Sequence, residues 1–224
     1  MISKELQHFN LYAKDKNISS LDLHYYNKNI ENNLTPYILE ERQLNVTAMD
    51  VFSRLMMERI IWVAGPVNDN MSTIVQAQLM FLDSIDNNDI TMHIDSPGGS
   101  VKSGLSMVDI MDYINSDIRT VNTGMAASMG SILLGAGTKG KRSSLRFSRT
   151  MLHQSSGGFS GNIQDAKIDM VEWEKLNNQL FDLLGEYCGK TAETVMSDAK
   201  RDLWLSSEEA LEYGIIDDIV KKKK

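Results

Sequence analysis

The sequence predicts an α/β fold whose strands pair mostly in parallel. From about residue 50 onward, short apolar runs typical of buried strands alternate with segments whose apolar residues recur at helical spacing. Eleven of the 15 glycines lie between positions 98 and 161, where the backbone has to turn tightly or approach another group closely. The chain has 224 residues, 42% of them hydrophobic and 24% charged, which suits one globular domain with a substantial core.

Three strand–helix units are expected in chain order. The first has a strand over 60–64, and the apolar face of its helix is expected to contain Met71, Ile74, Val75, Leu79, Leu82 and Ile85. The second has a strand over 90–95 and, after a Pro-Gly-Gly turn, a helix striped by Val101, Leu105, Val108, Met111 and Ile114. The third has a strand over 118–123 and a helix over 131–136.

Residues 1–36 differ in composition from the rest of the chain. They contain six asparagines and no glycine, and they end at Pro36. We expect an N-terminal extension of low intrinsic order. A removable pro-segment, a mobile cap and a tolerated tail all remain open as its role.

A long amphipathic helix is expected after the glycine-rich link at 157–161. Apolar residues follow at steps of three and four from Ile163 to Tyr187, and only Asn177 interrupts them. A helix packed along one face of the core would show this pattern. We favour a projecting helix that pairs with another subunit, because the segment is longer than the core of a small domain needs.

Composition argues against several classes of partner and cofactor. The net charge of −7 and the lack of a basic stripe disfavour nucleic-acid binding, and we expect Lys221–Lys224 to be a solvated tail. The lone Cys188 excludes an internal disulfide and a cysteine-cluster zinc site. Neither a long apolar run nor a secretory signal pattern is present, so we expect a cytoplasmic protein with no membrane partner. No HExxH motif or close His pair suggests a metal centre, so we expect no metal.

The segment Gly124–Ser131 carries the first candidate for chemistry. It places Ser128 among Gly and Ala residues, between an expected strand and an expected helix. Such a turn presents the serine Oγ outward, beside the free N–H groups of the helix start, as a nucleophile requires. A close-packed strand–helix crossing would also need small residues, and this segment alone favours neither interpretation.

A serine nucleophile needs a base, and the chain has four histidines. His8 and His24 lie in the extension, and His93 lies inside an expected strand, where a structural role is usual. His153 follows a short apolar strand over 149–152 and precedes a glycine-rich loop, so we favour it as the base. Too many carboxylates are present for spacing to select the group that would orient the imidazole.

Several motifs occur together and in order. They are Arg54–Ile60, Ser96–Gly99, Gly124–Gly130, Gly137–Arg142, Ser148–Gln154, Arg201–Ser206 and Ala210–Asp217. From about residue 36 to 220 the chain resembles the proteolytic subunits of the bacterial Clp protease family. The resemblance implies Ser128 as the nucleophile, His153 as the general base and Asp202 as the acid that holds the imidazole. It also implies an oxyanion hole formed by the backbone N–H groups of Gly99 and Met129.

The resemblance also implies a fold and an assembly. We expect a peptidase domain over 37–224 with the crotonase-like spiral of ββα units, and a protruding handle at about 155–190. The implied particle is a homo-oligomer of two stacked heptameric rings. An AAA+ Clp unfoldase of the ClpX or ClpA/ClpC type would deliver unfolded polypeptide to it. ATP would be used by that partner, because this chain has no phosphate-binding G-x-x-x-x-G-K-[ST] loop and we expect it to carry no cofactor.

Two other functions fit parts of this pattern. An acyl-CoA hydratase or isomerase can share the fold but needs no serine nucleophile, and a structural ring subunit would be expected to lack a member of the triad.

The chain also departs from the family at Ser155-Ser156, where proline is common, and at Phe147. These positions bear on substrate preference, whereas Thr91 and His93 bear on the docking partner.

Overall fold

A computed structural model of the chain describes residues 37–42, 45–158 and 162–221. The expected extension over 1–36 lies outside these residues. The chain forms two compact units, residues 1–58 and 59–224. The catalytic candidates all belong to the second unit.

The first unit contains a hairpin that the sequence pattern did not predict. Strands β1 (Tyr37–Arg42) and β2 (Asn45–Asp50) pair antiparallel, and helix α3 (Val51–Met57) follows directly. Asp50 caps the start of α3, because its carboxylate accepts hydrogen bonds from the backbone N–H groups of Phe52 and Ser53. This N-cap satisfies two of the amides that a helix start leaves without an intrahelical partner.

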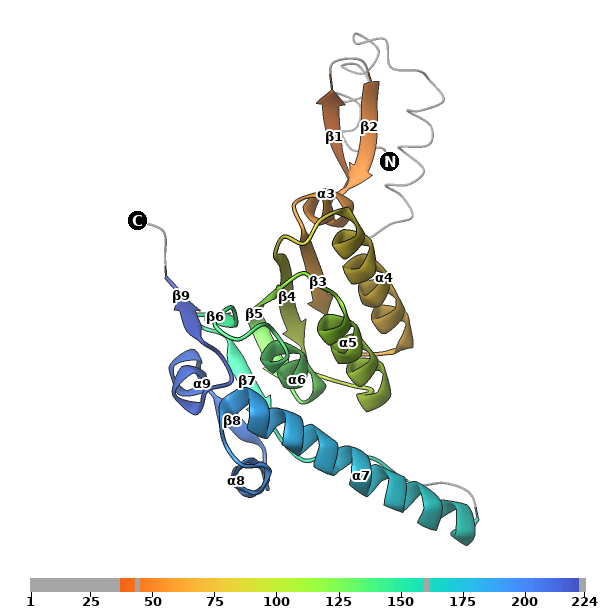
Figure 1. The fold of residues 1–224 in the computed structure, drawn as a ribbon, viewed down its shortest axis with the longest axis vertical. Helices are drawn as coiled ribbons and strands as arrows, with labels where there is room; N and C mark the ends of the chain where they lie inside the picture. Colours follow the sequence, from red (N-terminus) through yellow and green to blue (C-terminus); the bar gives the residue numbers. More distant parts are fainter. Residues whose placement is uncertain (1–36, 43–44, 159–161, 222–224) are drawn as a thin grey trace, which may run out of the picture. The chain divides into compact units, whose positions relative to one another are not determined.

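The second unit is built on a mostly parallel sheet, which confirms the predicted α/β class. Its main path is β3 (Ile60–Ala64), β4 (Ile90–Ser96), β5 (Ile118–Ala127), β6 (Ser143–Leu145) and β9 (Asp218–Val220). Strand β7 (Arg149–Leu152) pairs in parallel with the end of β5, and β8 (Leu203–Leu205) pairs antiparallel with β7. The three expected strand segments therefore lie side by side in the sheet (Figure 1).

Helices α4 (Asp69–Ile85), α5 (Val101–Tyr113) and α6 (Met129–Gly135) connect the strands and lie along the sheet (Figure 1). The expected apolar face of α4 is partly wrong. Val75, Leu79 and Leu82 are buried, but Ile74 and Ile85 are exposed, because they lie at the edge of the buried stripe.

Every residue of α6 is buried. The turn that precedes α6 is therefore anchored in the core.

The long helix α7 (Ile163–Cys188) has two different halves. Its C-terminal part buries Phe181, Leu184 and Cys188, whereas its N-terminal part extends beyond the sheet as a handle (Figure 1). The handle is helical only from Ile163, because residues 153–158 form irregular chain after β7. Helices α8 (Ala192–Asp198) and α9 (Ser207–Tyr213) complete the unit and flank β8.

A buried ion pair holds the C-terminal elements to the sheet. The Arg142 guanidinium, 1% exposed, donates hydrogen bonds to both carboxylate oxygens of Asp217 and to the carbonyl oxygens of Tyr187 and Gly214. Burial by itself would raise the pKa of Asp217, but the hydrogen bonds and charge of Arg142 outweigh burial and hold that pKa below its usual value. One side chain thus joins the end of α7 to the segments around β6 and β9.

Candidate active site

Ser128 lies at the sharp turn between β5 and α6. Strand β5 runs to Ala127, four residues beyond the expected end, and α6 begins at Met129. The backbone of Ser128 has φ 53° and ψ −122°, a conformation that non-glycine residues rarely adopt. Its N–H donates to the Met151 carbonyl oxygen on β7 at 2.9 Å. The turn is thus held by α6 on one side and by β7 on the other. A close-packed strand–helix crossing would explain the small residues but not this backbone strain.

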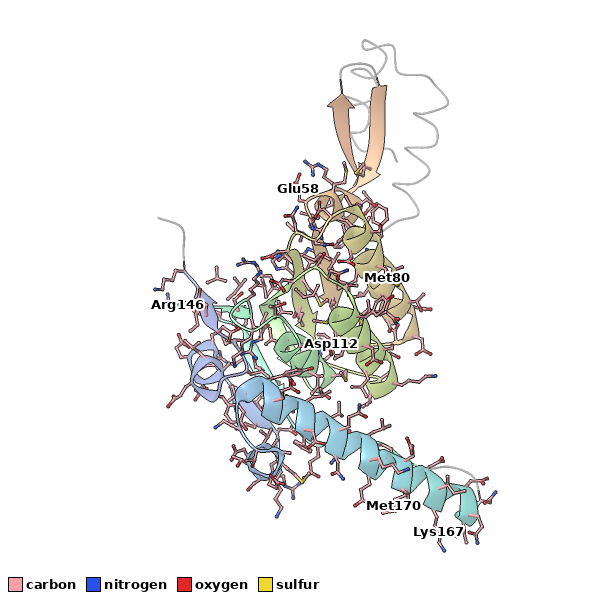
Figure 2. The ribbon with its side chains drawn as sticks, viewed as in Figure 1. Glu58, Met80, Asp112, Arg146, Lys167 and Met170 are labelled. Carbon is pink, nitrogen blue, oxygen red and sulfur yellow. The ribbon has the colours of Figure 1, made fainter. Side chains whose placement is uncertain are left out.

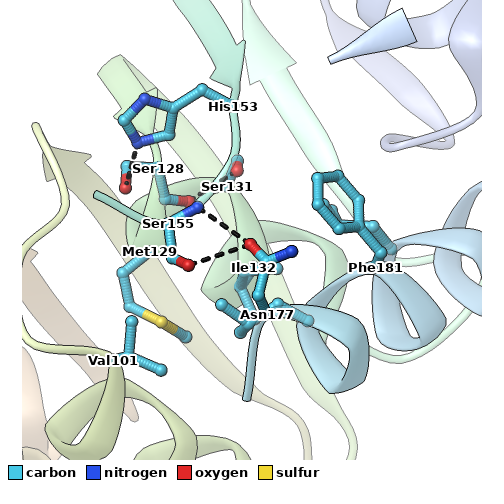
Figure 3. A pocket seen from close by; sticks show the side chains of 11 residues that line it. Val101, Ser128, Met129, Ser131, Ile132, His153, Ser155, Asn177 and Phe181 are labelled. Atoms are coloured by element: carbon cyan, nitrogen blue, oxygen red, sulfur yellow. Dashed lines mark hydrogen bonds between the residues drawn. The ribbon is translucent and has the colours of Figure 1, made fainter. Parts of the chain in front are cut away.

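His153 lies directly beyond the end of β7 and faces Ser128. Its Nε2 is 2.8 Å from the Ser128 Oγ, within the normal range of a hydrogen bond (Figure 3). The two residues are 25 apart in sequence and meet because β5 and β7 pair in parallel, with Ala127 beside Met151. The imidazole is partly buried, with 24% of the side chain exposed.

The pairing of β7 with β8 brings Asp202 next to His153. Leu152 is paired with Leu203, so one further step in the antiparallel register sets His153 opposite Asp202. The Asp202 Oδ1 lies 3.5 Å from the His153 Nδ1, and 61% of the Asp202 side chain is exposed. This separation exceeds that of a good hydrogen bond, and such contacts in enzymes without substrate often tighten when substrate binds.

The Pro-Gly-Gly turn after β4 lies against the nucleophile. A Cβ placed on Gly98 would be 2.6 Å from the Ser128 Cβ and 2.9 Å from the Met129 nitrogen. Gly99 has φ 152°, and a Cβ there would overlap the Val67 carbonyl. Backbone hydrogen bonds from Val67 to Gly98 and from Ser100 to Val67 hold the turn in place. Only glycine fits at both positions, and the close approach of Gly98 holds this turn beside Ser128 and the Met129 nitrogen.

Of the two described histidines, only His153 lies at this site. His8 and His24 lie outside the described residues. His93 lies in β4 as expected, where its ring stacks on Trp62 with centroids 4.8 Å apart. Burial lowers the pKa of His93, which favours the neutral ring. Among the described histidines, His153 alone makes a hydrogen bond to Ser128.

A pocket opens beside the serine and the histidine (Figure 3). Its wall is formed by residues of α5, α6, the chain after β7 and α7, namely Val101, Ser128, Met129, Ser131, Ile132, His153, Ser155, Asn177, Leu180, Phe181 and Leu184. The sequence pattern did not identify the part played by α7. The signal was present, because Asn177, the one interruption of the apolar stripe, faces this pocket and hydrogen-bonds Ser155.

The described residues hold no cluster of three or more His, Cys, Asp or Glu side chains arranged for a metal ion. Within the same part of the chain, no helix combines the length and apolar character needed to cross a membrane. Cys188, the lone cysteine, is buried at the end of α7, and burial raises the pKa of its thiol to about 11. The pocket itself is lined by the Ser128 hydroxyl and the His153 imidazole.

The serine lies at a strained strand–helix turn and is hydrogen-bonded to an imidazole, and a carboxylate lies beside that imidazole. This is the geometry of a serine hydrolase. Comparison with known proteins shows the family to which the chain belongs. The Clp protease family profile matches residues 42–223. The chain is 51% identical to the ATP-dependent Clp protease proteolytic subunit of Bacteroides fragilis over 191 residues, which cover 85% of this chain and 92% of that protein.

Two further relatives carry the same description. The Bacteroides thetaiotaomicron protein is 50% identical over 191 residues, covering 85% of this chain and 87% of the relative. The Porphyromonas gingivalis protein is 48% identical over 192 residues, covering 85% of this chain and 86% of the relative. The chain therefore belongs to the Clp protease family.

Proposed function

We propose that this chain is a serine endopeptidase subunit in which Ser128, His153 and Asp202 form the catalytic triad. The observation that carries the assignment is the 2.8 Å hydrogen bond between the Ser128 Oγ and the His153 Nε2 at the strained turn before α6. The membership of the Clp protease family supports peptide-bond hydrolysis as the reaction. A hydratase would make no use of this pair.

The geometry gives each group a role. His153 Nε2 accepts the Ser128 proton as Oγ attacks the substrate carbonyl carbon. The protonated imidazole then donates that proton to the leaving amine, which leaves an acyl group on Ser128. Water, activated by the same imidazole, releases the acyl group and restores the serine. Asp202, close to Nδ1, holds the ring orientation and stabilises its charged form.

The carbonyl oxygen becomes negatively charged during each attack. The N–H groups of Gly99 and Met129 form the oxyanion hole in this proposal, because the Gly98–Gly99 turn lies directly against Ser128 and Met129. Losing one such donor costs other serine hydrolases about 10²–10³ in kcat. Neither amide has a protein acceptor among the described hydrogen bonds, so both are available for the substrate oxygen.

The assembly and partners belong to the same proposal. The peptidase domain spans 37–224, with 1–36 as an N-terminal extension. It forms a homo-oligomer of two stacked heptameric rings in the cytoplasm of a bacterium. A ClpX- or ClpA/ClpC-type AAA+ unfoldase delivers unfolded polypeptide and uses the ATP. The relatives are named as subunits of an ATP-dependent protease, which supports this division of labour.

Covalent labelling tests the triad directly. A fluorophosphonate probe should form one adduct, and mass spectrometry should place it on Ser128 in the wild-type protein. The Ser128→Ala and His153→Ala variants should label poorly or not at all. An adduct on another serine, or equal labelling of the His153→Ala variant, would contradict the assignment.

A further inference from the structure

A small polar network joins the chain after the catalytic histidine to the handle helix. The Asn177 Oδ1 accepts a hydrogen bond from the Ser155 backbone N–H at 3.1 Å and from the Ser155 hydroxyl at 2.9 Å (Figure 3). The Trp173 Nε1 donates to the same hydroxyl oxygen at 2.5 Å. Trp173 and Asn177 lie four residues apart on α7, so both reach Ser155 from one face of the helix.

The indole of Trp173 also packs against the irregular chain itself. A Cβ on Gly157 would overlap its six-membered ring, so the backbone at this position lies directly on the indole. Trp173 is half-buried as a result, although the helix around it is exposed. Polar contacts at Ser155 and ring packing at Gly157 thus fasten the same short segment at two points.

Ser155, the first residue of this segment, lies two positions after His153. Strand β7 ends at Leu152, so regular sheet pairing does not extend to Ser155. The side-chain network supplies the anchor that the sheet no longer supplies. It requires a residue with both an N–H and a hydroxyl at position 155, and a proline could provide neither bond.

We propose that Asn177, acting through Ser155, is a positioning residue for His153. This inference rests on the proposed function of the serine–histidine pair. The network holds the chain that leaves β7, and with it the direction from which the imidazole approaches the Ser128 Oγ. A misplacement of about 1 Å can cost on the order of 10²-fold in rate, so a modest shift of this segment is enough to matter.

Matched variants at one turn of α7 test the proposal. Asn177→Leu keeps the size of the side chain and removes the acceptor, whereas Asn177→Asp keeps an acceptor oxygen. Asn178→Leu is the control, because Asn178 lies on the same turn but is exposed. Trp173→Phe retains an aromatic ring and deletes the N–H donor together with the pyrrole ring that carries it.

The rate of labelling by a small dialkyl fluorophosphonate is the main measurement, because such a probe does not depend on filling the pocket. Asn177→Leu should lower that rate and the kcat for a short peptide by about tenfold or more. We expect the KM to change less than kcat, and Asn177→Asp to restore most of the rate. Trp173→Phe should show a smaller loss, and Asn178→Leu none.

Sedimentation and thermal melting separate positioning from general stability. Unchanged labelling in Asn177→Leu, with labelling of wild-type Ser128 intact, would overturn this inference and leave the proposed function standing. A loss in Asn177→Leu that tracks an equal loss of assembly or of Tm would overturn it as well. If wild-type Ser128 does not label, the proposed function fails instead. Trp173→Phe provides the same test if Asn177→Leu does not fold.

Discussion

Ser128 occupies a backbone conformation that costs free energy in a residue with a side chain. Its φ of 53° lies in the region that favours glycine, and strain of this kind is typically about 1–3 kcal/mol. The strain presents Oγ toward His153 rather than along α6. Catalytic geometry and stability therefore make opposite demands on this one residue.

Two substitutions at Ser128 should separate these demands. Both Ser128→Ala and Ser128→Gly should lower peptidase activity on the order of 10⁴-fold or more, because the attacking oxygen is gone. Ser128→Gly should also melt at a higher temperature than Ser128→Ala, by an amount that corresponds to roughly 1 kcal/mol. Peptide assays and thermal denaturation of both variants check this. An equal Tm would mean that the turn carries no strain.

Activity should depend on pH through the imidazole. At acid pH the protonated ring of His153 has no lone pair at Nε2, so it cannot accept the Ser128 proton. The kcat/KM of a short peptide should therefore fall as the solution is made acidic enough to protonate the imidazole. Assays should be paired with sedimentation at each pH. A flat profile with the particle intact would contradict a histidine base.

Among the elements, α7 performs two separate tasks along its length. Its sequence pattern predicts a single apolar stripe that pairs with another subunit. In the structure Trp173 contacts Ser155 and Gly157 of its own chain, and Leu180 lines the pocket. The exposed apolar side chains of α7 lie nearer its start, at Ile163, Ile168, Met170 and Val171.

The exposed start of α7 is therefore the better place to test subunit pairing. Met170, 62% exposed, and Val171, 54% exposed, are available to a neighbouring subunit, and Met170 is labelled on this part of the helix in Figure 2. Met170→Asp/Val171→Asp should reduce the mass of the particle, because each charge buried without a partner costs several kcal/mol. The helix itself should remain, since both positions are exposed in the single subunit.

Analytical ultracentrifugation checks this prediction, with circular dichroism as a measure of helical content. Gln179→Asp is the matched control, because it adds a carboxylate at an exposed polar position of the same helix. Double rings that survive in Met170→Asp/Val171→Asp would show that this surface takes no part in assembly. Trp173→Asp would be a poor choice, because it would also disturb the chain after His153.

The Arg142–Asp217 pair ties the C-terminal elements together and should make stability depend on pH. The pKa of Asp217 is lowered in the folded protein, so its contribution is complete above the ordinary pKa and is lost as the pH falls through the folded value. Asp217→Asn leaves the buried Arg142 without its counter-ion and should cost about 3–5 kcal/mol. Melting curves between about pH 3 and 7 should show a weaker acid dependence for this variant than for wild type.

The exposed Asp218 provides the control for that measurement. Asp218→Asn removes the same charge one residue away, without touching a buried partner. Its melting temperature should stay near that of wild type across the range. An Asp217→Asn protein as stable as Asp218→Asn would show that the ion pair contributes nothing to holding β9 and α7 together.

The whole molecule is expected to act as one wall of a closed chamber. In the assembly proposed above, the active sites face an interior that admits only unfolded chain, and the sequence has no phosphate-binding G-x-x-x-x-G-K-[ST] loop. The purified protein should cleave short peptides but degrade a stably folded protein at least about 10²-fold more slowly, because most native proteins are unfolded only a fraction of about 10⁻³–10⁻⁶ of the time.

A folded protein and the same protein permanently unfolded by carboxymethylation provide the comparison. Gel assays without ATP should show little digestion of the folded form, and faster digestion of short fragments than of the long unfolded chain. Rapid digestion of the folded form in the absence of ATP would contradict the chamber, although it would leave the triad assignment intact.

Local patterns in the sequence determined the α/β class, the order of the strand–helix units and the candidates Ser128 and His153. Strand and helix periodicity and a run of small residues act over a few positions, so they can be read without tertiary structure. Asp202 could be selected only through the family resemblance, because nothing in its local sequence distinguishes it from other carboxylates.

Tertiary structure alone decided which of these groups meet. The parallel pairing of β5 with β7 brings Ser128 and His153 together, and the antiparallel register of β7 with β8 brings Asp202 beside the imidazole. The link from Asn177 to Ser155 spans 22 residues and depends on where α7 crosses the pocket. Strand register and helix placement follow from packing across the whole unit, which no short stretch of sequence contains.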